Sequence, residues 1–120
     1  MAARKLVDIV EGWTQELEPF RLWSDGAPVD LTGLTVDLVV KDKDGTDVPI
    51  TRSKVRVDSD QTWDAVTETG GRGKIYLTPT DGPFTNALSP YTIRAKVTDG
   101  SGKIAFWPNG APDTIVVFKP

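Results

Sequence analysis

The stretch from residue 91 to 107, YTIRAKVTDGSGKIAFW, is the part of the chain that decides the fold. From Tyr91 to Val97, apolar and polar residues alternate, which is the period of a strand that buries one face. Asp99 to Gly102 consists of residues that favour tight turns, and Lys103 to Trp107 can pair back on the first run. This stretch therefore predicts a β-hairpin that covers a hydrophobic core.

The same alternation recurs along the chain. Leu34 to Val40 alternates in this way, and the turn at 41–46, with Asp44-Gly45, leads to a return strand that starts at Val48. Shorter alternating runs lie at 7–13, 17–23, 55–57, 73–79 and 115–118. No segment keeps helical apolar spacing over three turns. The sequence thus predicts an all-β fold, a β-sandwich of about seven to nine short antiparallel strands rather than a small barrel.

Three segments are less regular. Pro19 interrupts the strand predicted over Leu17–Trp23, which indicates an edge strand or a bulge. The polar segment 58–73 contains adjacent glycines and is interpreted as a long loop with a short strand near Trp63–Val66. Segment 81–89 is expected to be a loop with one helical turn.

The 120 residues are the size of one domain. We expect a single β-sandwich over residues 13–120, preceded by an N-terminal arm or edge strand over residues 1–12. Val7 and Ile9 in this segment could add a strand to a neighbouring chain, unless the first ten residues pair only within their own chain. The basic start is followed by Asp8 and Glu11 without an apolar run, so we expect no secretory signal.

The composition removes several classes of function. The chain has no cysteine and no histidine, which excludes disulfides, the usual zinc sites and Ser-His-Asp or Cys-His catalysis. Its net charge is −3 without a basic cluster, so we expect no nucleic-acid partner. No run is apolar and long enough to cross a membrane. We expect no enzyme activity, no cofactor and no metal.

Three stretches in fixed order carry a resemblance to one family. DGAPVDLTG at 25–33 leads into the strand at 34–40, GKIYLTPTD follows at 73–81, and PYTIRAKVTD at 90–99 leads to FWP and a final DTIVV. Over residues 14 to 118, this order resembles the immunoglobulin-like domain at the N-terminus of the baseplate upper protein of tailed bacteriophages. Segment 58–72 is longer and more polar than in that family.

The resemblance implies an immunoglobulin-like sandwich that is a structural component of a virion. Such a protein would belong to a baseplate, tail, connector or capsid-associated layer, after synthesis in the host bacterial cytoplasm. It would dock onto other virion proteins in several copies of a symmetric assembly. In such a sandwich Tyr91 can bury its ring and bond a backbone group through its hydroxyl, as in a tyrosine corner.

Two acidic clusters suggest calcium, but both have a simpler interpretation. The segment 42–47, DKDGTD, resembles the start of an EF-hand loop, but Ser53 stands where the last carboxylate ligand is required. We interpret it as a hairpin turn. Asp58, Asp60 and Asp64 could gather around a cation, although a solvated loop is the simpler interpretation.

Glu16 and Glu18 are the pair that most resembles a glycosidase site, and hence a hydrolase. The two carboxylates of such a site flank the scissile bond from opposite sides, about 5 to 9.5 Å apart. Residues two apart on one strand share a face instead. We therefore expect no catalytic residues.

The four tryptophans are the strongest candidates for contact with a partner. Trp107 is expected to pack at a strand end, whereas Trp63 lies in the polar loop. Aromatic rings can stack on sugars, so a carbohydrate-binding host-adhesion module is the alternative function. Tryptophan is enriched at protein interfaces, which favours protein contact. The candidate interface consists of Val7, Ile9, Trp13, Trp63 and Trp23.

Overall fold

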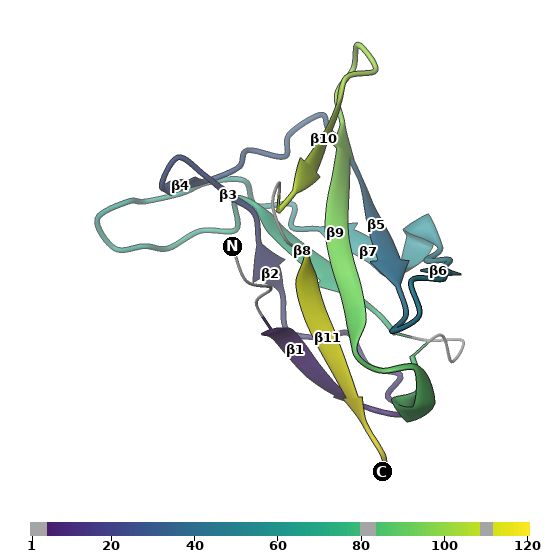
Figure 1. Cartoon of the computed structure of the whole chain (residues 1–120). Helices are drawn as coiled ribbons and strands as arrows, with labels where there is room; N and C mark the ends of the chain where they lie inside the picture. The colour runs from purple at the N-terminus through teal and green to yellow at the C-terminus, as the bar shows by residue number, and fades with distance from the viewer. Residues whose placement is uncertain (1–4, 80–83, 109–111) are drawn as a thin grey trace.

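A computed structural model describes residues 5–79, 84–108 and 112–120, with side chains from Asp8 onward (Figure 1). Within these ranges there are eleven strands and two short 3-10 turns. The strands are β1 (Lys5–Val10), β2 (Phe20–Arg21), β3 (Trp23–Ser24), β4 (Ala27–Pro28), β5 (Thr35–Lys41), β6 (Asp47–Val48), β7 (Val55–Val57), β8 (Lys74–Leu77), β9 (Tyr91–Thr98), β10 (Ile104–Trp107) and β11 (Asp113–Phe118). The turns are η1 (Arg52–Lys54) and η2 (Asn86–Leu88). The all-β prediction is confirmed.

The strands form two main sheets and a small ribbon. The large sheet has the order β1-β11-β9-β5-β6, with β10 also paired to β9. The second sheet has the order β2-β8-β7, and β3 and β4 form the separate ribbon. The described pairs are antiparallel apart from β1 and β11, which run parallel. The expected all-antiparallel arrangement is wrong there, because these two strands are joined through the whole chain and no hairpin sets their direction.

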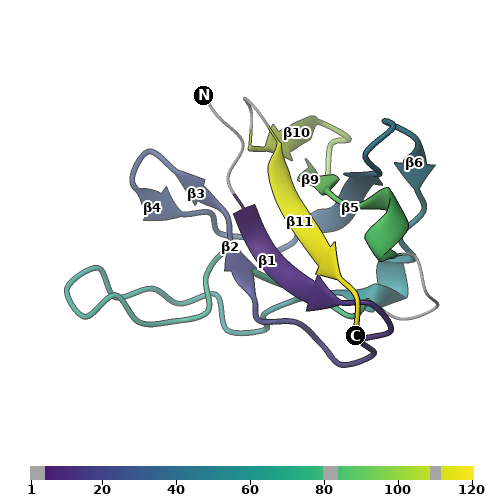
Figure 2. The same cartoon turned by 60° about the horizontal axis from the view of Figure 1, so that its bottom comes forward.

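The core lies between the two main sheets, an arrangement compatible with a β-sandwich (Figure 2). Alternate residues of β5, β9 and β11 point inward, as their period of two requires. Ile75 and Leu77 of β8 face them from the second sheet. The buried core residues are Ile9, Leu22, Leu31, Val36, Leu38, Val40, Ile75, Leu77, Phe84, Tyr91, Ile93, Ala95, Val97, Ile115 and Val117.

Tyr91 at the start of β9 fastens the core to the turn before it. Its side chain is fully buried, and its hydroxyl accepts the N–H of Thr85 at 2.8 Å. The ring packs on Phe84 with centroids 5.0 Å apart. The expected buried ring and backbone-bonded hydroxyl are confirmed. The expected helical turn is present as η2, while residues 81–83 lie outside the described part.

The segment around Pro19 differs from the strand predicted at 17–23. Only Phe20–Arg21 and Trp23–Ser24 are strands, because proline cannot donate to a ladder and its segment leaves the sheet. β2 lies at the edge of its sheet, as Pro19 indicated. Interruptions of this kind make the strands shorter and more numerous than the seven to nine expected.

β1 is the edge strand of the large sheet and pairs with β11 of the same chain. Residues 5–10 therefore belong to the sheet of this domain. The backbone groups along one edge of β1 bond to β11 of the same chain and need no neighbouring chain. Trp13 lies beyond the strand, where its N–H donates to the Val10 carbonyl at 3.0 Å.

Candidate interaction surface

Residues 58–73 form a projection that we call the finger, and its two arms are bonded to each other. The N–H of Asp64 donates to the Thr69 carbonyl at 2.9 Å, and the N–H of Thr69 donates back at 3.3 Å. Closer to the base, the N–H of Arg72 donates to the Thr62 carbonyl at 3.2 Å. The short strand expected at 63–66 is instead the isolated bridge between Asp64 and Thr69.

Gln61 fastens the base of the finger to the sandwich. Its Oε1 accepts the N–H of Leu31 at 2.9 Å and that of Gly73 at 3.3 Å. Its Nε2 donates to the Asp58 carbonyl at 2.7 Å. One amide thus joins three backbone segments, a role that no sequence pattern indicated.

Two glycines allow the arms to approach. A Cβ at Gly70 would lie 2.1 Å from the Thr62 carbonyl oxygen, and its φ of +121° is strained for other residues. A Cβ at Gly71 would lie 2.3 Å from the Asp60 carbonyl oxygen. The adjacent glycines are therefore needed for the finger to close on itself.

The carboxylates of the finger cap its own turns. Asp60 Oδ1 accepts the hydroxyl and the N–H of Thr62, which lowers the pKa of Asp60. Asp64 Oδ1 accepts the N–H of Val66 at 2.9 Å, and this bond lowers the pKa of Asp64. In the described residues, no group of three or more carboxylates is placed to hold a metal ion. The geometry agrees with a solvated loop.

Asp58 and Glu16 bond to groups on the second sheet. The N–H of Asp60 and the Tyr76 hydroxyl hold the pKa of Asp58 below its usual value. Glu16 accepts two bonds from Arg56, at 2.9 and 3.1 Å, and these lower its pKa. The Arg56 guanidinium in turn lies 3.8 Å from the centre of the Tyr76 ring.

Arg21, Trp23 and Trp63 form an aromatic surface that we call the platform. The two indole rings meet edge to face at 5.6 Å. Arg21 Cζ lies 4.6 Å from the Trp63 centroid and 5.9 Å from that of Trp23. Such ring and cation–π contacts each contribute about 0.5–1.5 kcal/mol. Trp23 is 45% exposed, and Trp63 is half-buried.

Arg21 also ties the platform to the finger. Its Nε donates to the Arg72 carbonyl at 3.0 Å, and its Nη2 donates to the Gly70 carbonyl. Both views show the finger and the β3–β4 ribbon projecting on the same side of the sandwich (Figures 1 and 2). The sequence offered both tryptophans as candidates, but the arginine that joins them was missed.

The remaining candidate residues lie elsewhere. Trp13 is 46% exposed and, with exposed Val10 and Phe118, forms an end patch where β1 and β11 finish. Ile9 is only 3% exposed and belongs to the core, so its side chain is not part of an interface. Val7 pairs with Ile115 in the β1–β11 register, and its side chain lies outside the described part.

A hairpin patch forms the third exposed apolar surface. Ile104 and Phe106 on β10 are 53% and 43% exposed. Trp107, at the end of the same strand, packs against the core as expected.

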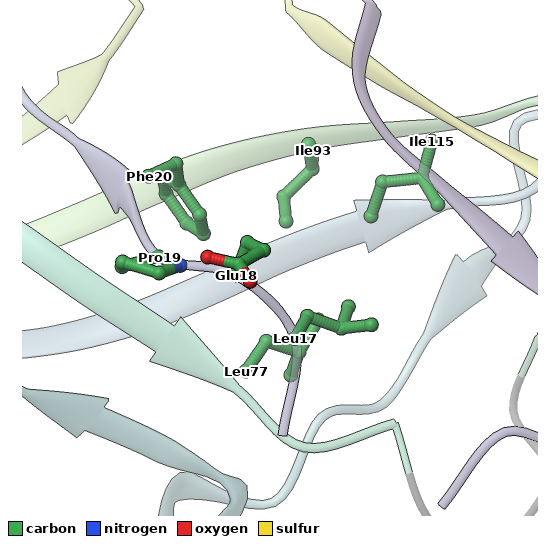
Figure 3. Close-up of a pocket in the computed structure, with 7 residues that line it drawn as sticks. All are labelled: Leu17, Glu18, Pro19, Phe20, Leu77, Ile93 and Ile115. Atoms are coloured by element: carbon green, nitrogen blue, oxygen red, sulfur yellow. The ribbon is translucent and has the colours of Figure 1, made fainter. Parts of the chain in front are cut away.

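Glu18 lines a small cavity of about 50 Å³ beneath the segment that Pro19 interrupts (Figure 3). Leu17 and Leu77 lie together on one side of it, and Ile93 and Ile115 lie on the other. Glu18 is the single carboxylate among the residues that line this cavity. Glu16 lies outside the lining and pairs with Arg56. The two glutamates do not face each other across a cavity, so their arrangement does not resemble a glycosidase pair.

The turn at 42–47 is a hairpin turn. Asp42 Oδ1 accepts the N–H groups of Asp44 at 2.9 Å and Thr46 at 3.1 Å. Gly45 has a φ of +81°. Asp42 thus caps the turn through its carboxylate.

The fold and these surfaces define an all-β domain with exposed aromatic patches. Comparison with protein-family models, with curated proteins and with solved structures found no match. Within the described residues, no helix is long and apolar enough to cross a membrane.

Proposed function

We propose that the protein is a non-enzymatic structural component of a tailed bacteriophage virion that docks onto other virion proteins. It would lie in a baseplate, tail, connector or capsid-associated layer and reach the virion from the bacterial cytoplasm. The virion assignment rests on the sequence stretches that resemble the baseplate upper protein domain. The docking role rests on one observation, which is that the described part of a well-packed sandwich exposes large apolar side chains in three patches, besides Val66 at the tip of the finger.

The strand order supports an immunoglobulin-like fold as part of this proposal. In that fold, strands C, F and G form one sheet and strands B, E and D belong to the other. Here β5, β9 and β11 are neighbours in the large sheet, and β2, β8 and β7 form the second. The bond of the Tyr91 hydroxyl to the backbone near the start of β9 is of the kind made by a tyrosine corner and supports this part of the proposal.

The exposed side chains are of the kinds that protein interfaces use. Val10 and Phe118 are paired in the strand register, the Trp13 N–H bonds to the Val10 carbonyl, and Trp23 lies beside Trp63. Aromatic residues are enriched at interfaces and dominate their energetics. Extended apolar patches on a soluble domain mark surfaces that a partner covers.

A carbohydrate-binding host-adhesion module is the second candidate, supported by the exposure of Trp23. The platform geometry favours a protein partner over a sugar. Trp63 meets Trp23 at an interplanar angle of 89°, and the Arg21 guanidinium lies over the Trp63 ring. The two indoles therefore offer no continuous flat face for successive sugar rings.

Mass spectrometry of purified virions from the phage that encodes this chain tests the proposal. We expect the protein in intact particles in several copies. Particles assembled with Phe118→Asp should lose it, whereas those assembled with the control Val66→Asp, at the exposed tip of the finger, should retain it. Absence from wild-type particles together with binding of the purified chain to host polysaccharide would overturn the structural role.

A further inference from the structure

The segments that carry the platform concentrate negative charge. Residues 21–31 and 58–73 contain two arginines and six carboxylates, a net charge of −4 within a chain whose total is −3. Both arginines donate to backbone carbonyls of the finger, at Gly70, Arg72 and Gln61. The platform thus presents aromatic rings within an acidic surround.

The β9–β10 hairpin has the complementary character. Residues 91–107 contain Arg94, Lys96 and Lys103 against a single Asp99. Phe106 lies directly opposite Lys96 in the strand register, so the ring and the ammonium group share one face of the sheet. Ile104 lies opposite Thr98 on that same face. Asp37 of β5 lies opposite Lys96 on its other side but pairs with Arg52, so the hairpin patch is an apolar surface beside net positive charge.

We propose that the platform of one copy binds the hairpin patch of a second copy. Trp23 and Trp63 contact Ile104 and Phe106, and the acidic finger faces Lys96. In both views the finger and the β3–β4 ribbon project from one side of the sandwich, whereas β10 lies within the large sheet (Figures 1 and 2). An interface between two different surfaces is head-to-tail, and its repetition builds a ring or a filament.

Charge complementarity favours a second copy as the partner. The platform segments carry a net negative charge and the hairpin a net positive charge, and each surface exposes large apolar groups. The platform is held in place by the bonds of Arg21 and by the closed finger, so little conformational freedom is lost on binding. The contact must weaken as salt screens the exposed charges.

Sedimentation velocity of the purified full chain tests this inference. We expect reversible association that grows with protein concentration and weakens at least several-fold between 50 mM and 500 mM NaCl. Trp23→Ala removes the platform and Phe106→Ser removes the hairpin patch, so each variant alone should be monomeric. An equimolar mixture should form dimers that grow no further, because each pair retains one intact contact. Trp13→Ala, which removes a similarly exposed tryptophan of the end patch, should associate like the wild type.

A wild-type chain that stays monomeric at every concentration overturns the inference, as does a variant mixture that stays monomeric. Loss of association in Trp13→Ala would also overturn it, because the end patch would then be the contact. Circular dichroism of each variant confirms that it remains folded. This inference rests on the proposed function and identifies a second copy of the chain as one of its docking partners. Its failure is separable from failure of the virion role, because the purified chain is measured without virions.

Discussion

Replacement of Gly70 by alanine is expected to open the finger while the sandwich stays folded. The added Cβ would lie 2.1 Å from the Thr62 carbonyl oxygen, far inside ordinary contact distance. The φ of +121° at this position costs an alanine about 1–3 kcal/mol. The two arms must therefore separate, and the bond from Arg72 N–H to the Thr62 carbonyl is lost with the bond from Arg21 to residue 70.

The expected cost follows from these contacts. Each lost hydrogen bond contributes about 1 kcal/mol, and the Arg21–Trp63 contact adds about 0.5–1 kcal/mol. With the backbone strain, Gly70→Ala should lower the free energy of unfolding by about 3.5–6 kcal/mol. Gly45→Ala is the matched control, since its φ is +81° and nothing lies within 4 Å of an added Cβ. That change should cost only about 1–2 kcal/mol.

Urea unfolding measures the stability of both variants, and near-ultraviolet circular dichroism reports on the packing of Trp23 and Trp63. We expect Gly70→Ala to lose the part of the tryptophan signal that comes from the Trp23–Trp63 contact, and Gly45→Ala to keep it. If Gly70→Ala proved no more destabilising than the control and left the signal unchanged, the closed finger described above would be wrong.

Three further predictions concern the core and the finger. Tyr91→Phe leaves the Thr85 N–H without its acceptor and should cost about 1–2 kcal/mol in urea unfolding. Ile115→Ala, at a fully buried residue beside the cavity, should cost about 2–5 kcal/mol by the same measurement. The pKa of Asp58 is lowered in the folded protein, mainly by the Asp60 N–H. Ionised Asp58 therefore stabilises the fold fully above its unfolded pKa of about 4. This stabilisation is lost as the pH falls through the lower folded pKa. Stability measured from pH 6 to 2 should therefore fall less steeply below pH 4 in Asp58→Asn.

Each of these predictions has a result that contradicts it. Equal stability of Tyr91→Phe and the wild type would mean that water replaces the hydroxyl. A cost below about 1 kcal/mol for Ile115→Ala would mean that the core collapses around the gap. Identical acid profiles for Asp58→Asn and the wild type would place the pH dependence in other carboxylates.

The long strands were predictable from sequence because their signal is local. β5, β9 and β11 each bury every second residue, so apolar and polar residues alternate along their sequences. The turn at Asp44-Gly45 was predictable for the same reason, since its chemistry lies within four residues. The backbone bond of the Tyr91 hydroxyl was expected from the resemblance, because alternation alone indicates only that the ring is buried.

The finger could not be predicted, because long-range contacts hold it. Gln61 bonds Leu31, 30 residues away, and Arg21 bonds the carbonyl of Arg72, 51 residues away. Neither pairing leaves a periodic pattern in the sequence. The position of Ile9 was missed for a similar reason, since its burial depends on β1 lying beside β11, more than 100 residues later.

The parallel pairing of β1 and β11 has a mechanical consequence. The chain enters β1 at one end of the pair and leaves β11 at the other, as the termini in Figure 1 show. A force that pulls the start of β1 and the end of β11 apart would load all the backbone hydrogen bonds between the two strands at once, in shear. An antiparallel hairpin that is pulled at its two ends instead opens one bond at a time. The parallel pair is therefore arranged to resist a pulling force applied along the two strands.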